Sequence, residues 1–386
     1  MCGPCCGVRL PALRAVTHTP KGLSMSLNET VVRQALQTVN DPEIGKDLVT
    51  LNMVGKISIT GSAVKVVIDL TTPACPLKGK IQDDIEQALK KVGVDQVDIE
   101  WGVQMAGQMH QQQSLVPGIG YVIAVGAGKG GVGKSTMAVN LAAGLMRSGA
   151  RVGLLDADIY GPSIPTMMGL NEKPKAGADK KILPMQAHGM KVISMGSFVD
   201  DEAALVWRGP MLNKALRQFF ADVRWGELDY LVVDLPPGTG DVPLSIAQMV
   251  TVGAAVIVTT PQDVAVADVL RAKTMFDTLK IPVAGVIENM AGFTPPGGGD
   301  PIPLFGQGGG EKAAQRLGVP LIGQLPIDAR VSNQGDEGTP VVLADPQSDL
   351  ALSMLELAQN VAGRLSVLAL ERKAGTRSGS IQVDHR

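Results

Sequence analysis

The hydrophobic pattern of the chain changes near residue 120. Beyond it, short apolar runs that predict buried strands alternate with longer runs that have the spacing of amphipathic helices. The predicted strands are Val122–Val125, Val152–Leu155, Leu231–Val233, Ala255–Val258 and Ala284–Ile287. The run Val264–Leu279 is an example of the helical spacing. Such alternation is typical of a doubly wound, mostly parallel sheet, so we predict an α/β domain over residues 121–370.

Residues 26–103 contain shorter elements. The predicted order is a helix from Asn28 to Val39, strands Val54–Thr60 and Val64–Leu70, a helix over Leu77–Val92 and a strand over Val97–Trp101. Asn28 is a good helix cap, and the turn at Gly61–Ser62 predicts a hairpin between the first two strands. The αββαβ order predicts a separate, small α+β domain.

Three segments lack either pattern. Residues 104–120 are rich in Gln, Gly and Met, which predicts a flexible linker. Residues 371–386 are polar and are expected to be a disordered tail. Residues 1–25 carry three cysteines in the first six positions and end at a second methionine, Met25. We interpret them as a disordered or mis-started tail, with a short metal-binding tail as the alternative, and not as a signal peptide.

Composition limits the possible functions. A chain of 386 residues is long enough for two domains. Its net charge of −2, without a long basic run, argues against nucleic-acid binding. No stretch of about 18 apolar residues is present, so no membrane association is expected. The four cysteines do not form a disulfide framework, which favours a cytoplasmic protein.

The strongest chemical signal is a glycine-rich run that satisfies the phosphate-binding pattern G-x-x-x-x-G-K-[ST]. It lies between a predicted strand and a predicted helix, which is the context that the motif needs. Its candidate nucleotide-binding residues are Gly128, Lys129, Gly130, Gly131, Val132, Gly133, Lys134, Ser135 and Thr136. Lys134 can reach the β- and γ-phosphates of ATP, and the hydroxyl of Ser135 can bind Mg²⁺.

Carboxylates follow two other predicted strands. Asp156 and Asp158 end one, and Asp234 ends another in the arrangement of a Walker B motif, where the aspartate holds Mg²⁺ through its water shell. The segment Pro236–Asp241 is a candidate switch loop, in which the N–H of Gly238 senses the γ-phosphate. For Asp156 and Asp158, the alternative interpretation is that they only cap a turn.

The run from Lys129 to Lys134 resembles the deviant phosphate loop of the ATPases that include MinD, ParA, nitrogenase iron protein and the Mrp/ApbC proteins. The resemblance implies that Lys129 crosses a homodimer interface to the partner's nucleotide. It also implies that Asp158 positions the hydrolytic water and that Asp156 supports the metal. By the same resemblance Asn289, Pro326 and Asp328 hold the adenine. Trp207–Met211 also matches the Mrp/ApbC proteins, although Arg208 has no assigned role.

The small domain narrows the resemblance to one group of these ATPases. Its segments Asp41–Glu43 and Thr72–Pro76 resemble the small domain of iron–sulfur cluster assembly proteins, and residues 26–369 as a whole resemble Mrp/ApbC. Cys75 would be the reactive thiol or iron–sulfur ligand, because the neighbouring prolines predict an exposed turn. A buried, inert thiol is the alternative.

One departure from that family is plain in the sequence. Its members carry a Cys-x-x-Cys pair whose copies from two subunits bridge a [4Fe–4S] cluster, whereas residues 291–301 here contain no cysteine. Thiolates are the usual cluster ligands. A bound cluster would therefore have to use Cys75, the N-terminal cysteines or a partner protein.

Three hypotheses follow. The first is a homodimeric ATPase that binds iron–sulfur clusters and transfers them to apoproteins, with ATP and Mg²⁺ as cofactors and cluster assembly proteins as partners. The second is a positioning ATPase of the MinD or ParA type that binds membrane or DNA. The third is a nucleotide switch in cluster assembly that holds no cluster itself.

Overall fold

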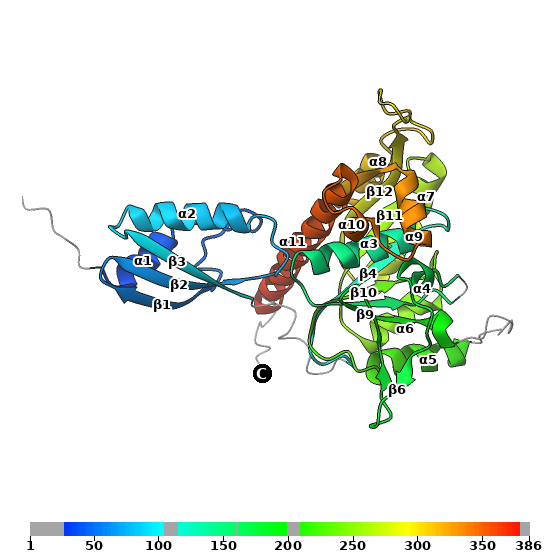
Figure 1. Ribbon diagram of the computed structural model, residues 1–386, viewed down its shortest axis with the longest axis horizontal. Coiled ribbons are helices and arrows are strands. Elements are labelled where there is room, and N and C mark those ends of the chain that lie inside the picture. Colours follow the sequence, from blue (N-terminus) through cyan, green and yellow to red (C-terminus); the bar gives the residue numbers. More distant parts are fainter. Residues whose placement is uncertain (1–26, 104–114, 160, 199–208, 379–386) are drawn as a thin grey trace, which may run out of the picture.

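The computed structural model describes residues 27–103, 115–159, 161–198 and 209–378, which form two domains (Figure 1). The predictions about the N-terminal cysteines, most of the linker, Arg208 and the last eight residues lie outside this part of the chain.

The small domain has the predicted αββαβ order. Its elements are α1 (Glu29–Leu36), β1 (Val54–Thr60), β2 (Ala63–Leu70), α2 (Lys78–Lys90) and β3 (Gln96–Val103). Strand β2 is central, antiparallel to β1 and parallel to β3. Asn28 caps α1, because its Oδ1 accepts a hydrogen bond of 3.0 Å from the N–H of Val31. Alternate residues of β2 are buried in the core, as period-two alternation requires.

The large domain is built on an eight-stranded sheet with the order β13-β12-β11-β4-β10-β5-β9-β8. All neighbouring pairs are parallel except β8 and β9, so the doubly wound α/β fold is confirmed. The strands are β4 (Ile119–Ala127), β5 (Val152–Asp156), β8 (Met185–Ala187), β9 (Met190–Ser194), β10 (Leu228–Asp234), β11 (Val252–Thr259), β12 (Val283–Phe293) and β13 (Leu321–Ile327). Strands β6 (Lys175–Ala176) and β7 (Ile182–Leu183) form a separate hairpin.

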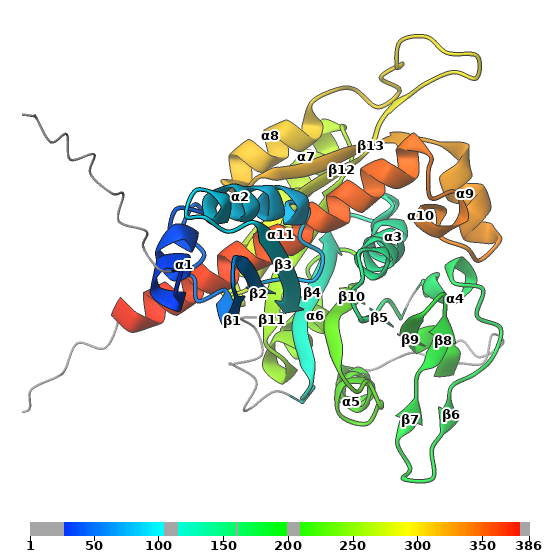
Figure 2. The ribbon, with the colours of Figure 1, turned by 60° about the vertical axis from the view of Figure 1, so that its left-hand side comes forward.

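Helices cover both faces of this sheet (Figures 1 and 2). The core on one face includes α3 (Lys134–Arg147), α10 (Val341–Ala344) and α11 (Asp349–Ser378), with α4 (Ile164–Met167) and α9 (Ala329–Asp336) near its edge. The core on the other face includes α5 (Gly209–Ala221), α6 (Asp241–Met249), α7 (Asp263–Thr278) and α8 (Gly309–Leu317). A short 3₁₀ helix, η2, spans Met195–Phe198. Within the described residues, no helix has the length and apolarity needed to cross a membrane.

Several predicted boundaries were wrong. Strand β4 begins at Ile119, inside the predicted linker. Helix α11 does not end at Leu370 but continues to Ser378, into the predicted disordered tail. Residues 371–374 are good helix formers, and the guanidinium of Arg372 donates hydrogen bonds of 3.4 Å to the carbonyls of Val252 and Lys280. Strand β12 continues past its predicted end at Ile287 to Phe293, because Phe293 pairs with Ile302 in a hairpin.

Candidate nucleotide-binding site

The candidate site lies at the carboxyl ends of the central parallel strands, where α/β sheets bind ligands. Strand β4 leads into the glycine-rich loop, and α3 begins at Lys134, so the predicted strand–loop–helix context is present. Strands β5 and β10 end side by side, with Asp156 paired with Asp234 in register. The fold therefore brings Asp156 and Asp234 to the edge of the sheet where the glycine-rich loop and the start of α3 lie.

The glycines of the loop meet specific conformational needs. Gly131 and Gly133 have φ angles of 78° and 82°, in the left-handed region that favours glycine. A Cβ at Gly128 would collide with the backbone of Asp268 in α7. The loop can thus wrap closely around an anion, with the positive end of the α3 dipole directed at it.

Lys134 is buried at the centre of the site and pairs with a carboxylate. Its Nζ lies 2.7 Å from Oδ1 of Asp234. The other oxygen of Asp234 accepts a hydrogen bond of 2.5 Å from the hydroxyl of Ser135. Strand β10 and the start of α3 are thus joined at the two positions that the sequence predicted for phosphate and Mg²⁺.

Asp156 is fully buried beside this pair. Its Oδ2 accepts a hydrogen bond of 2.8 Å from the hydroxyl of Ser194, and its Oδ1 accepts one of 3.1 Å from the N–H of Asp158. Burial, together with the nearby charge of Asp234, raises the pKa of Asp156 to about 7. Burial also raises the pKa of Asp234, although Lys134 opposes that shift.

Asp158 completes the group. Its Oδ2 lies 3.5 Å from Nζ of Lys134, while its buried Oδ1 has no hydrogen-bond partner among the described residues. Three carboxyl groups therefore face one ammonium group, and one buried oxygen is unsatisfied. A divalent cation would balance the excess negative charge, and an ordered water could donate a hydrogen bond to the unsatisfied oxygen. The residues therefore fit Mg²⁺.

The described side chains do not form a closed metal cage. Within the resolved ranges, no group of three or more His, Cys, Asp or Glu residues is arranged to hold a metal ion. This suits Mg²⁺, which keeps several waters and is bound by few protein ligands together with substrate phosphates.

Two predicted residues are not engaged at the phosphate position in this conformation. Lys129 is partly exposed, and no hydrogen bond or ion pair links it to another described residue. Gly238 has φ of 87°, and its N–H donates a hydrogen bond of 3.0 Å to the carbonyl of Ala127, not toward a phosphate. The loop after β10 is thereby tied to the end of β4.

The predicted adenine residues line one pocket of about 270 Å³ next to the glycine-rich loop. Gly133, Thr136, Asn289, Pro326 and Asp328 all contribute to its wall. The amide of Asn289 donates a hydrogen bond of 3.0 Å to the carbonyl of Val132, which joins β12 to the glycine-rich loop.

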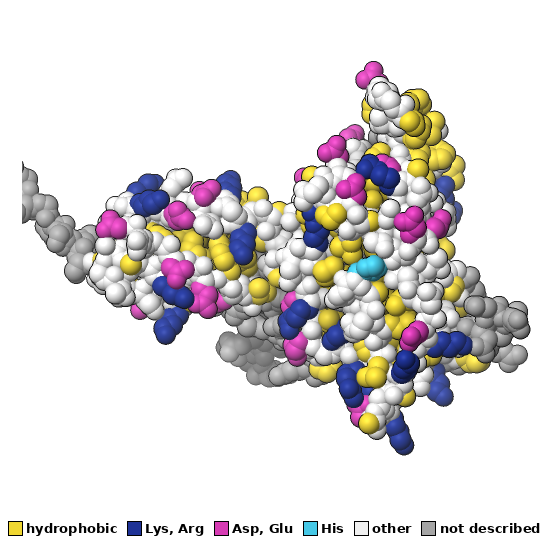
Figure 3. Space-filling view, in the orientation of Figure 1, with side chains coloured by type: hydrophobic (Ala, Val, Ile, Leu, Met, Phe, Trp, Pro, Cys, Tyr) yellow, Lys and Arg dark blue, Asp and Glu magenta, His cyan; other side chains and the backbone are white. Residues whose placement is uncertain are grey.

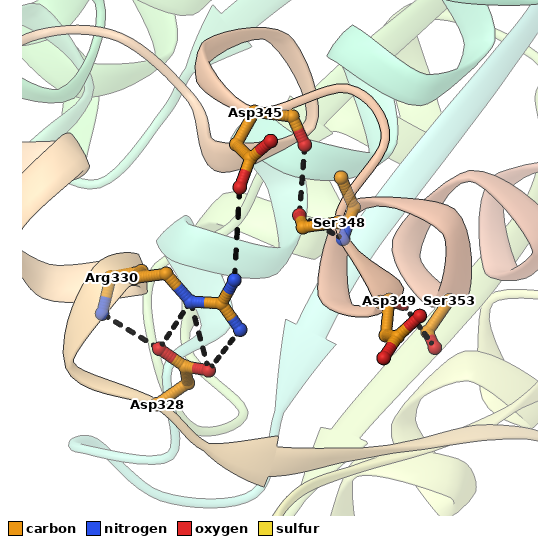
Figure 4. Close-up of polar contacts among 7 residues, drawn as sticks. Asp328, Arg330, Asp345, Ser348, Asp349 and Ser353 are labelled. Atoms are coloured by element: carbon orange, nitrogen blue, oxygen red, sulfur yellow. Dashed lines mark hydrogen bonds and ion pairs between the residues drawn. The ribbon is translucent and has the colours of Figure 1, made fainter. Parts of the chain in front are cut away.

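The carboxylate of Asp328 is already paired (Figure 4). It caps α9 and lies 2.7 Å from the guanidinium of Arg330, which keeps the pKa of Asp328 below its usual range. Arg330 also reaches Asp345, at 3.8 Å. The sequence analysis did not anticipate this pairing.

The predicted exposure of the Cys75 turn was wrong. Thr72 and Ala74 are buried where the turn lies against the large domain, and Cys75 is half-buried against the core of its own small domain. Burial raises the pKa of the Cys75 thiol to about 11. The thiol is therefore protonated at neutral pH in this conformation.

Two features of the site escaped the sequence analysis. Ser194 orients Asp156 from the end of β9, and its only sequence signal is its place after an apolar run. The cysteine-free segment after β12 forms a projecting loop, in which Gly297, Gly298 and Gly299 all have positive φ (Figure 2).

Known proteins support this description of both domains. A family model for NUBPL iron-transfer P-loop NTPases matches residues 118–362, and a model for iron–sulfur cluster assembly proteins matches residues 29–101. The iron–sulfur cluster carrier protein of Deinococcus radiodurans is 50% identical over 346 residues, covering 89% of this chain and 97% of the relative. That of Synechocystis sp. is 45% identical over 355 residues, covering 89% of this chain and 99% of the relative.

A solved structure agrees for the large domain. The nucleotide-binding protein of Archaeoglobus fulgidus in complex with ADP has 39% sequence identity and a TM-score of 0.53, covering 60% of this chain and 90% of that chain. The match confirms a nucleotide-binding P-loop ATPase fold. With this match and relatives at this level of identity, the chain belongs to the NUBPL iron-transfer P-loop NTPase family, and its N-terminal domain matches the iron–sulfur cluster assembly proteins.

Proposed function

We propose that this protein is a cytoplasmic, ATP-hydrolysing carrier that delivers iron–sulfur clusters to apoproteins. The observation that carries the proposal is the convergence of Lys134, Ser135 and three aspartates at the glycine-rich loop, in a chain fused to a cluster-assembly domain. Relatives at up to 50% identity are named iron–sulfur cluster carrier proteins.

In this proposal the chain's own groups bind and orient ATP. The N–H groups of the loop and the ammonium of Lys134 hold the β- and γ-phosphates, which draws Lys134 away from Asp234. Asn289, Pro326 and Asp328 position the adenine in the adjoining pocket. Asp158 accepts a hydrogen bond from the attacking water through the oxygen that lacks a partner here.

Ser135 and Asp234 would hold Mg²⁺, with Asp156 behind them. When bound, the ion neutralises charge on the phosphates. Release of Asp234 from Lys134 frees its Oδ1 for this role, while its Oδ2 already lies beside the hydroxyl of Ser135. The hydrogen bond of Ser194 keeps Asp156 oriented toward Asp234.

The catalytic form in this proposal is a homodimer with ATP between the subunits. Lys129 supports it, because this lysine is not engaged by the described residues of its own chain. In the dimer it would contact the partner's nucleotide, and hydrolysis would relax the loop that contains Gly238.

The cluster itself is cargo, and its ligands would be thiolates. Residues 291–301 contain none, so Cys75 is the candidate within the described chain, with Cys2, Cys5 and Cys6 outside it. The direct test is transfer. The anaerobically reconstituted protein is mixed with an apoenzyme that needs a [4Fe–4S] cluster, with and without ATP. Activation of the apoenzyme supports a carrier, and no activation under either condition refutes it.

A nucleotide switch that holds no cluster is the second candidate function. The cysteine-free loop after β12 favours it. The same transfer experiment separates the two, because a switch would hydrolyse ATP normally and yet carry no iron.

A further inference from the structure

The wall of the candidate base pocket contains the carboxylate of Asp328, at the point where α9 begins. Arg330 occupies both oxygens of this carboxylate (Figure 4). Oδ1 accepts hydrogen bonds of 2.8 Å from the backbone N–H of Arg330 and of 3.0 Å from its Nε. Oδ2 accepts one of 2.7 Å from Nη2 and a longer one of 3.2 Å from Nε. An ionised carboxylate has about four acceptor positions, so Oδ1 is saturated and Oδ2 keeps room for at most one further donor.

Arg330 is held from its other side as well. Its Nη1 lies 3.8 Å from Oδ2 of Asp345, which follows α10. Acidic side chains also lie on the surface over α9, where Asp336 and Glu337 are exposed (Figure 3). A guanidinium keeps its charge at any pH at which the protein is folded. These acidic groups therefore favour the position of Arg330 beside Asp328.

The two purine bases differ in what they offer to such a wall. Guanine presents two neighbouring donors, its ring N–H and its 2-amino group, which together match the two oxygens of a free carboxylate. Adenine presents one amino group beside a ring nitrogen that accepts. A carboxylate that is occupied by a guanidinium can still take the single donor of adenine. Guanine would be left with an unpaired donor, which costs binding free energy.

We propose that Arg330 is a specificity-determining residue of the nucleotide site, which selects adenine over guanine by occupying the carboxylate of Asp328. The inference rests on the proposed function, in which this pocket holds the base of ATP, but its test needs neither hydrolysis nor iron. The pocket wall contains a second carboxylate, Asp336. Because Asp336 is exposed, water competes with a base for it.

The test is the affinity of the full chain for ADP and for GDP with Mg²⁺, each nucleotide carrying a fluorophore on its ribose so that the base is unchanged. Arg330→Ala frees both oxygens of Asp328, so the preference for ADP over GDP should fall at least about tenfold. Arg330→Lys keeps the charge but lacks the planar fork, and its preference should lie between the two. Arg224→Ala is the matched control, because Arg224 pairs with Asp179 of the β6–β7 hairpin at 2.8 Å. It should bind both nucleotides like the natural chain.

Double variants separate a role in specificity from a role in shape. Asp328→Asn retains a helix-capping side chain but offers guanine only one acceptor oxygen. Added to Arg330→Ala, it should restore most of the preference for ADP, whereas Asp336→Asn added to Arg330→Ala should not.

Three results would overturn the assignment of Arg330. They are a natural chain that binds GDP as tightly as ADP, an unchanged preference in both Arg330 variants, and an equal loss of affinity for the two nucleotides in both variants. Any of these with normal binding of ADP would leave the proposed ATPase intact. A natural chain that binds neither nucleotide would overturn the nucleotide site together with the role of Arg330.

Discussion

Lys134 is the residue on which the nucleotide site is centred. It is 7% exposed, and it balances the charge of Asp234 at 2.7 Å and Asp158 at 3.5 Å. A buried ammonium paired in this way can exchange a carboxylate for a phosphate by a small movement of its side chain. Its position beside two carboxylates therefore suits a site that takes up an anion together with a cation.

Lys134→Ala should lower ATP turnover by at least about 10²-fold, because it removes a preorganised charge from the phosphates. Phosphate release measured at saturating ATP checks this. Lys175→Ala, an exposed lysine on the β6–β7 hairpin, is the control and should leave turnover unchanged. Normal turnover in Lys134→Ala would show that the phosphates bind elsewhere.

Lys129→Ala separates binding from chemistry. Lys129 makes no polar contact with the described residues, so its loss should leave nucleotide affinity within about twofold. Turnover should fall at least about tenfold if the lysine acts on the partner's nucleotide. Titration with a fluorescent ATP analogue, alongside phosphate release, measures the two effects. A loss of affinity with unchanged turnover would contradict a role across the dimer.

Those site residues that belong to local sequence motifs could be predicted from the sequence. Lys134 and Ser135 lie within a continuous motif, and Asp156 and Asp234 follow recognisable strands, so their meeting followed from the parallel sheet. The hydrogen bond from Ser194 and the ion pair between Arg330 and Asp328 depend on side chains that no motif specifies. These could only be seen in the folded chain.

At the scale of elements, the glycine-rich loop depends on close packing against α7. Gly128 has no room for a Cβ beside the backbone of Asp268, whereas a Cβ at Gly130 would meet only Pro237, at 4.0 Å. The two glycines are neighbours in one loop and yet differ in steric demand.

Gly128→Ala should therefore destabilise the large domain by about 1–3 kcal/mol, since backbone must move to admit the methyl group. Gly130→Ala should change stability by less than about 0.5 kcal/mol. Thermal unfolding of both variants without nucleotide makes the comparison. Equal melting temperatures would mean that the loop does not pack on α7 as described.

Element types were predictable from hydrophobic period, and element ends were not. The strands and the αββαβ order were confirmed because each has a distinct apolar pattern. The extensions of α11 to Ser378 and of β12 to Phe293 depend on tertiary contacts of Arg372 and Ile302. Polar composition alone could not reveal them.

At the scale of the whole molecule, the docked small domain buries an acidic group. Burial and the charge of Asp41 raise the pKa of Glu43 from 4.5 to about 7. A carboxyl group with a raised pKa in the folded state binds more protons folded than unfolded between these values. Its contribution to stability is therefore present at low pH and is lost as pH rises from about 4.5 to 7.

Glu43→Gln should remove the loss of stability that ionisation of Glu43 causes as the pH rises. At pH 8 the variant should melt about 2 °C above the natural chain, a modest value because the carboxyl is partly solvated. The difference should shrink toward zero near pH 4.5. Melting curves across this range test it, and a difference that does not vary with pH would show that Glu43 is not the titrating group.

The docking of the two domains could not be predicted from sequence. Adjacent prolines suggested an exposed Cys75 turn, but the partner surface comes from Tyr230 and Gly363, more than 150 residues away along the chain. The sequence around Tyr230 and Gly363 contains no motif that predicts a contact with the small domain. The docking places Thr72 and Ala74, in the turn that contains the candidate thiol, against the large domain.

The carrier function is tested most directly by anaerobic reconstitution with iron and sulfide. The natural chain and its Cys75→Ala variant are compared by visible absorption and by iron bound per subunit. The account predicts a stable cluster in the natural chain and its loss in Cys75→Ala. No cluster in the natural chain would contradict the carrier function and leave an ATP-driven switch without iron.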